Sequence, residues 1–121
     1  MPKSEGPVAG FLPLTPAVFH VLLALSDSER HGYAIAREVA DRTDGQVRLG
    51  PGTLYGTLTR LLAAKLVDEV EPSETRKGAS DDRRRYYRLT PLGRAVARAE
   101  ARRLADLVSV ARAKSLLTSR R

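Results

Sequence analysis

The chain has 121 residues, a formal net charge of +7 at pH 7 and no cysteine. This length suits one domain with an appended element, and the absence of cysteine excludes disulfides and cysteine-ligated metals. No apolar run approaches the roughly 20 residues that cross a bilayer, and the N-terminus lacks the apolar core of a signal peptide, so we expect a cytoplasmic protein without a membrane partner, a metal or a cofactor.

Charge is distributed unevenly along the chain. Residues 11–75 sum to −3, whereas residues 76–90 sum to +4 and residues 91–121 to +6. A concentration of like charge repels itself and is most easily explained by an anionic partner. The sequence therefore places an anion-binding surface in the C-terminal half, with nucleic acid or an anionic membrane surface as the partner.

The N-terminal part predicts a flexible arm and two helices. We expect the arm at residues 1–10. Thr15 and Pro16 then predict the start of a helix over 16–26, because threonine caps helices and proline lacks an N–H where none is needed. Apolar residues at helical spacing predict a second helix that ends near Thr43. Residues 46–49 could form a short strand.

A third helix, expected at 52–65, is the predicted DNA-reading element. One side carries large residues: Leu54, Leu58, Leu61, Leu62 and Lys65. The opposite side is small: Gly52, Thr53, Gly56, Thr59, Arg60 and Ala63. Glycine and threonine lower helix propensity, but a small face lets a helix approach closely to a major groove about 12 Å wide. Tyr55 lies on the flank, where it either donates to a phosphate or packs against the second helix.

Two short strands at 66–70 and 85–89 predict a hairpin. Strand alternation places Tyr87 and Leu89 toward the core and leaves Tyr86 exposed. The tip and the returning strand carry candidate phosphate contacts: Arg76, Lys77, Arg83, Arg84 and Arg85. A solvated, charge-rich turn is the alternative. Three helices followed by a hairpin predict a mainly α fold, a winged helix-turn-helix over residues 11–90.

The last helix, expected from Pro91 with Thr90 as its cap to about Leu117, would be about 40 Å long. Together with a basic tail it forms the predicted dimerisation unit, residues 91–121. Its apolar stripe supplies the candidate contacts: Leu92, Val96, Ala99, Leu104, Leu107, Val108 and Ala111. One domain cannot cover this length, so pairing with a second chain is expected. A helix lying on anionic lipid is the alternative, but the alanine-rich stripe would insert only shallowly.

Three segments in order carry a family resemblance: HGYAIAREV (31–39), PGTLYGTLTRLLAAKLV (51–67) and RRYYRLTPLGR (84–94). They resemble the PadR family of transcriptional regulators over about residues 11–95. The resemblance implies a winged-helix DNA-binding domain followed by a dimerisation helix, usually in a repressor that responds to a small molecule, and it adds Tyr33 to the DNA contacts. Gly56 and Thr59 depart from the family pattern, which commonly has proline and a basic residue there. The chain also lacks the tryptophan with which some members hold aromatic drugs.

These observations predict a dimeric, DNA-binding transcriptional regulator acting on a palindromic operator, and not an enzyme. His20 and His31 have no carboxylate or nucleophile at a catalytic spacing, and the chain has no glycine-rich phosphate loop with a lysine. An RNA-binding winged helix and a protein-interaction module are the alternatives. RNA recognition usually recruits exposed aromatic residues, for which Tyr86 is the candidate. A protein-interaction module would not need +10 over its last 46 residues.

Overall fold

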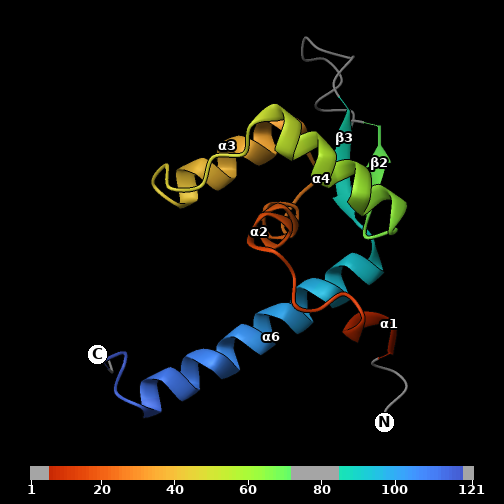
Figure 1. The fold of residues 1–121 in the computed structure, drawn as a ribbon. Coiled ribbons are helices and arrows are strands. Elements are labelled where there is room, and N and C mark those ends of the chain that lie inside the picture. The colour runs from red at the N-terminus through yellow and green to blue at the C-terminus, as the bar shows by residue number, and fades with distance from the viewer. Residues whose placement is uncertain (1–5, 72–84, 119–121) are drawn as a thin grey trace.

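The computed structural model describes residues 6–71 and 85–118. Its elements follow in chain order (Figure 1): α1 (Gly6–Ala9), α2 (Pro16–Ala24), β1 (Arg30–His31), α3 (Gly32–Arg42), α4 (Pro51–Ala63), β2 (Val67–Val70), β3 (Tyr86–Leu89) and α6 (Pro91–Ala113). The three strands form one antiparallel sheet in the order β1-β3-β2. The mainly helical winged-helix prediction is confirmed. Four candidate phosphate contacts, Arg76, Lys77, Arg83 and Arg84, lie outside the described residues.

Two helix starts match the predicted caps. The Thr15 hydroxyl accepts a hydrogen bond from the Val18 amide at 3.2 Å, and the Thr90 hydroxyl accepts one from the Gly93 amide at 2.9 Å. Each cap is followed by a proline in the first turn. Capping oxygens satisfy amides that have no intrahelical acceptor, which explains why α2 and α6 begin where they do.

The end of α6 differs from the prediction. The helix stops at Ala113, and Ser115 adopts a φ of 67°, in the left-handed region. The Leu116 amide then donates back to the Ala111 carbonyl at 2.9 Å, a closure typical of helix C-termini. Leu116 and Leu117 therefore follow the helix instead of extending it.

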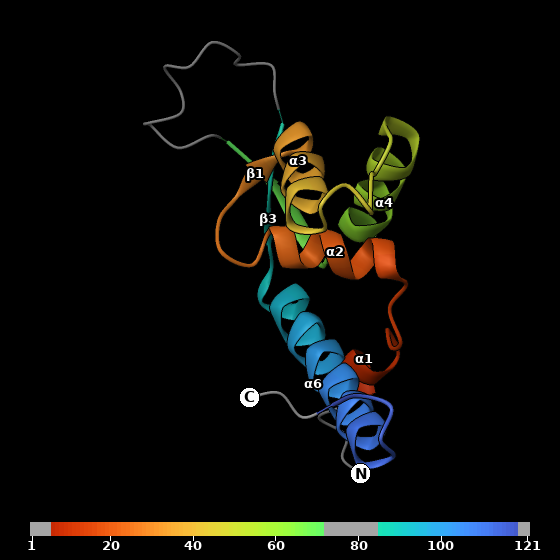
Figure 2. The same ribbon diagram turned by 90° about the vertical axis from the view of Figure 1, so that its left-hand side faces the viewer.

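The core is built around α2, which lies between α3 and α4 on one side and α6 on the other in both ribbon views (Figures 1 and 2). The apolar side chains of α2 from Val18 onward are thereby fully or partly buried. Residues from every layer are fully or almost fully buried: Val21, Leu22, Leu25, Ile35, Val39, Leu58, Leu66, Val67 and Val96.

The predicted exposure of Tyr86 is wrong. Tyr86 is only 8% exposed, because the unpredicted strand β1 pairs with β3 and sets His31 opposite Tyr86. The two rings meet edge to face, with centroids 5.3 Å apart. The predicted core positions Tyr87 and Leu89 are confirmed as buried. The short strand expected at 46–49 is wrong: this segment is an irregular connection whose Val47 and Leu49 pack against the core.

The start of α6 is locked to the residues that follow α4. Gly93 is buried, and a Cβ atom there would lie 3.0 Å from the Leu66 carbonyl carbon. The Thr90 amide donates to the Leu66 carbonyl at 3.0 Å, and its hydroxyl donates to the Lys65 carbonyl at 2.8 Å. Lys65 itself, expected on the inner side of the third helix, is exposed with a φ of 67°. A close backbone contact thus joins α4 to α6.

The structure adds detail at both ends of the predicted winged-helix domain. Residues Gly6–Ala9, expected in a flexible arm, form α1, which packs on α6 (Figure 2). Val96 and Ala97 of α6 belong to the buried core, so the first half of this helix is part of the winged-helix domain. No helix in the described part of the chain is long and apolar enough to cross a membrane.

Candidate nucleic-acid interface

The outward face of α4 is open and small. Gly52, Thr53, Thr59 and Arg60 are exposed, as their positions on the helix predicted, and Gly56 is partly exposed. A Cβ atom added at Gly52 would meet nothing within 4 Å. The opposite face is held in the core by Leu54, Leu58 and Leu61, and also by Thr57, which the sequence did not single out. The helix backbone is therefore accessible along one side.

The polar side chains on this face differ in whether their hydrogen-bond donors are already used within the protein. The Thr59 hydroxyl donates to the Tyr55 carbonyl at 2.8 Å, one turn back in the same helix. Within the described residues, the side chains of Thr53 and Arg60 make no hydrogen bond or ion pair. On this face of α4, the side-chain donors of Thr53 and Arg60 are therefore available to a ligand.

His31 organises the start of α3. Its Nδ1 accepts a hydrogen bond from the Ala34 amide at 3.1 Å, so this nitrogen carries no proton and His31 serves as the helix cap. Its ring stacks on that of Tyr33, with centroids 6.3 Å apart, and meets the edge of Tyr86. Tyr33 itself is 61% exposed.

Tyr55 packs against the same helix start. A Cβ atom at Gly32 would lie 2.8 Å from the Tyr55 Cζ, so the ring lies directly on the backbone at the first residue of α3. The predicted packing against the second helix is therefore present. The side chain is still 47% exposed, which leaves the alternative role as a phosphate donor open as well.

These groups surround a small surface hollow of about 110 Å³. It is lined by His31, Gly32, Tyr33, Tyr55 and Arg85. The first amides of a helix have no intrahelical acceptor, and the positive end of the helix dipole favours an anion there. Two tyrosines and an arginine surround this helix start. The hollow therefore has the size and chemistry of a site for one phosphate group.

An acidic residue on β2 partly neutralises the arginine that lines the hollow. Arg85, the residue before β3, is largely exposed. Its Nε lies 3.4 Å from Oε2 of Glu69 on β2. Exposed ion pairs of this kind are weak, so a phosphate can compete for the guanidinium group. Arg85 is the one predicted hairpin contact that the structure describes, and it lies at the hollow.

The candidate dimerisation residues separate into two groups. Val96 is fully buried in the protomer, so its side chain cannot contact a second chain, and that assignment is wrong. Leu92 and Ala99 are partly covered within the protomer. Leu107 and Val108, in the second half of α6, are exposed, and Leu104 and Ala111 partly so. The apolar surface left uncovered is therefore the second half of α6.

The described residues contain no group of three histidine or carboxylate side chains that could hold a metal ion.

The remaining histidine, His20, accepts a hydrogen bond at Nδ1 from the Arg42 guanidinium at 3.0 Å. Partial burial and then the charge of Arg42 hold the pKa of His20 below its ordinary value. His31 thus caps α3, and His20 is hydrogen-bonded to Arg42.

Comparison with known proteins decides the family. Residues 21–99 match the transcriptional regulator PadR-like family. The chain belongs to this family. A transcriptional regulator of Mycobacterium tuberculosis is 40% identical over 89 residues, which cover 73% of this chain and 75% of that protein. The crystal structure of a PadR family regulator from Clostridium difficile R20291 superimposes with a TM-score of 0.65 at 26% identity, over 78% of this chain and 92% of that one.

Other relatives extend the likeness in fold and in sequence. The structure of a transcriptional regulator from Clostridium thermocellum shares the fold, with a TM-score of 0.64 at 22% identity over 91% of this PadR-like chain and 93% of that chain. An uncharacterized 37.1 kDa protein in a transposon of Streptomyces fradiae is 45% identical over 87 residues. The PadR-like chain covers 22% of that protein and 65% of an uncharacterized Lysinibacillus sphaericus relative, so it spans less than two thirds of either.

Proposed function

We propose that this PadR-like regulator binds double-stranded DNA with α4 in the major groove. The observation that carries the proposal is the adjacency of two surfaces. Tyr55 of α4 lines the phosphate-sized hollow at the start of α3, and the small, open face of the same helix carries the available donors of Thr53 and Arg60. A helix that reads base edges needs backbone contacts to hold its register, and the hollow supplies them.

Each contact has a distinct part in this proposal. Arg60 and Thr53 contact base edges, where a bidentate arginine discriminates between bases by about 1–3 kcal/mol. Tyr33, Tyr55 and Arg85 hold a phosphate, and Gly56 lets the helix approach the groove. Arg76, Lys77, Arg83 and Arg84 add phosphate contacts from the hairpin tip. Thr59, whose hydroxyl already donates within the helix, contributes by shape and by accepting a hydrogen bond.

The regulator acts as a homodimer in this proposal. The uncovered apolar residues of α6, among them Leu107 and Val108, are buried against a second copy. A two-fold dimer presents two copies of α4, which fits a palindromic operator with half-sites about 34–36 Å apart. Repression in the cytoplasm, relieved by a small-molecule effector, completes the proposal and follows from the family resemblance. Tyr86, the candidate aromatic residue of the RNA-binding alternative, is buried, whereas Tyr33 and Tyr55 are exposed.

Selection of bound duplexes from a random DNA pool tests the proposal. We expect enrichment of a two-fold symmetric sequence whose half-sites are about one helical turn apart. The same selection with Arg60→Ala should enrich it less strongly, whereas Arg37→Ala, an exposed change on α3, serves as the matched control. A pool that stays random after selection by the unmodified protein would contradict sequence-specific DNA binding.

A further inference from the structure

Arg60 is the charged side chain of helix α4. The other residues of Pro51–Ala63 are uncharged, and no acidic residue lies three or four positions from Arg60, where an ion pair along a helix would form. The side chain is exposed and makes no ion pair within the described residues. The open face of α4 therefore carries one guanidinium group whose charge the helix itself does not balance.

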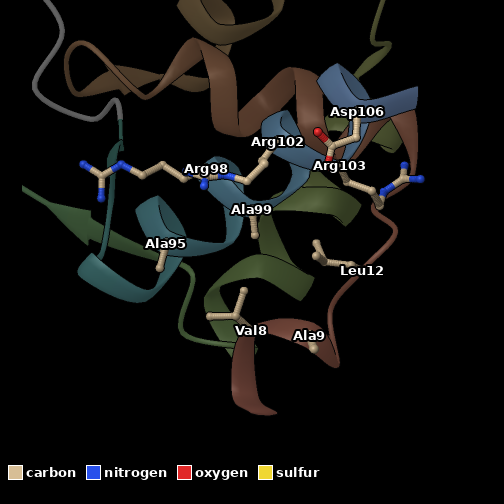
Figure 3. A pocket seen from close by; sticks show the side chains of 9 residues that line it. All are labelled: Val8, Ala9, Leu12, Ala95, Arg98, Ala99, Arg102, Arg103 and Asp106. Atoms are coloured by element: carbon tan, nitrogen blue, oxygen red, sulfur yellow. The ribbon is translucent and has the colours of Figure 1, made fainter. Parts of the chain in front are cut away.

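Two arginines of α6 differ from Arg60 in this respect. Arg103 lies 2.8 Å from Glu100, and Arg102 lines the groove beside α1 together with Asp106 (Figure 3). A nearby carboxylate reduces the charge that an arginine offers to a ligand. The absence of such a neighbour on α4 favours a partner for Arg60 from outside the protein, and the acceptors within reach of a helix in the major groove are base edges.

Gly56 leaves space for the Arg60 side chain. Side chains on a helix lean toward its N-terminus, so the side chain of residue 60 covers the turn that contains residue 56. A Cβ atom at Gly56 would lie 3.8 Å from Nη1 of Arg60, which is ordinary van der Waals contact. The guanidinium group therefore lies over the bare backbone of Gly56. A methyl group at residue 56 fits beside it, whereas a longer side chain would compete for the same space.

We infer that Gly56 is a positioning residue that sets where Arg60 reads DNA, and that the base read by Arg60 is guanine. The inference rests on the proposed binding of α4 in the major groove and specifies its base preference. Guanine presents two acceptors, O6 and N7, on its major-groove edge, and these match the paired N–H donors of a guanidinium group. Because this group lies over Gly56, its donors are at the part of α4 where a glycine lets the backbone approach the base edges closely.

Base-by-base substitution in the selected operator tests this inference. Each guanine of a half-site is replaced by adenine, and the loss of affinity is measured at one salt concentration for the wild type, Arg60→Ala, Gly56→Leu and the double variant. The matched controls are Gly56→Ala, whose methyl group fits beside Arg60, and Gly52→Leu. The latter adds the same bulk to the same face at a position where a Cβ atom meets nothing within 4 Å.

We expect one guanine whose replacement weakens binding of the wild type and of both controls by roughly tenfold or more. For Arg60→Ala and Gly56→Leu the same replacement should cost less than about threefold, and the double variant should lose no further discrimination, because both changes remove one contact.

Two results would overturn the inference while leaving the proposed DNA binding intact. In the first, Arg60→Ala weakens every duplex by the same factor, which would make Arg60 a phosphate contact. In the second, Gly56→Leu keeps the full preference for guanine, which would exclude the positioning role of Gly56. A wild-type protein that enriches no DNA sequence would overturn both the inference and the proposed function.

Discussion

The ring of Tyr55 lies on the backbone of Gly32, so the proposed reading helix α4 and the start of α3 are in direct contact. A methyl group at residue 32 would come within 3.0 Å of two ring carbons and the hydroxyl oxygen of Tyr55. Because these atoms belong to a half-exposed side chain, the ring can move aside, and the contact is adjustable rather than rigid. Its position sets the shape of the phosphate-sized hollow.

Gly32→Ala should therefore act through Tyr55. We expect it to lower the free energy of unfolding by about 1 kcal/mol, the low end for an overpacked contact. In a Tyr55→Ala background the same substitution should be neutral or stabilising by up to about 0.5–1 kcal/mol, since alanine favours helix over glycine. Urea denaturation of the wild type, Gly32→Ala, Tyr55→Ala and the double variant measures this double-mutant cycle. Equal effects of Gly32→Ala in both backgrounds would show that the ring is not the contact that matters.

An ion pair within α6 lies against the segment before α2, where the Leu14 backbone also bonds to Glu100. Both carboxylate oxygens of Glu100 accept from Arg103, at 2.8 and 2.9 Å, and the side chain of Glu100 is only 3% exposed. Arg103 lowers the pKa of Glu100 chiefly through these hydrogen bonds, and the Leu14 backbone adds another. The pair thus stabilises folding above the ordinary pKa of a glutamate and loses this effect as the pH falls through the lowered value.

Arg103→Met should lower the free energy of unfolding at neutral pH, because it leaves a buried carboxylate without its main partner. Arg102→Met, on the exposed side of the same turn, should change the free energy of unfolding by less than about 0.5 kcal/mol. Adding Glu100→Met to the first variant should restore part of the loss. Chemical denaturation measures all three, and equal values for the two arginine variants would exclude the proposed role of the pair.

The pKa of His20 predicts a separate dependence on pH. Since burial and Arg42 lower this pKa in the folded state, the unfolded chain takes up the proton first as the pH falls below about 6.5. The free energy of unfolding should therefore fall between pH 7.5 and pH 5.5. His20→Gln should flatten this slope in urea denaturation. If the free energy of unfolding varied with pH equally in the wild type and in His20→Gln, the pH dependence would belong to other groups.

Helix starts and the helical core were predictable because their signals are local. Thr15 and Thr90 each stand before a proline and an apolar helical pattern, and both act as the predicted caps. The small face of α4 could also be read from the sequence, because helical periodicity places Thr53 and Arg60 away from the leucines. These features depend on neighbours within one or two turns.

Features that depend on distant partners could not be predicted in this way. Strand β1 has two residues, too few to show an alternating pattern, yet its pairing is what buries Tyr86. Glu100 is a charged residue of the kind expected on a helix surface, and only the structure shows that it is buried and bonded to the Leu14 backbone. The role of Gly32 was equally hidden, because it exists only where α3 meets Tyr55.

The hairpin arginines should determine how DNA affinity responds to salt. Each neutralised phosphate contributes about −0.9 to the slope of log K against log salt, so Arg85→Ala in a dimer should flatten the slope by roughly 1.8. Glu69→Gln, which removes the partner of Arg85, should raise the affinity severalfold. Arg83→Ala and Arg84→Ala extend the series, and we expect one or two of the three arginines to matter. Slopes equal to that of the unmodified protein for all three would remove the hairpin from the binding surface.

The central claim is that α4 reads the base sequence while the hollow and hairpin hold the backbone. The most direct test is the ratio of affinities for a selected operator and a scrambled duplex, measured at one salt concentration for the wild type, Thr53→Ala, Arg60→Ala and Arg85→Ala. We predict that Arg60→Ala and Thr53→Ala reduce this ratio, with about 1–3 kcal/mol lost per base contact, whereas Arg85→Ala weakens both duplexes alike. An undiminished ratio for both α4 variants would contradict the assignment of α4 as the reading helix.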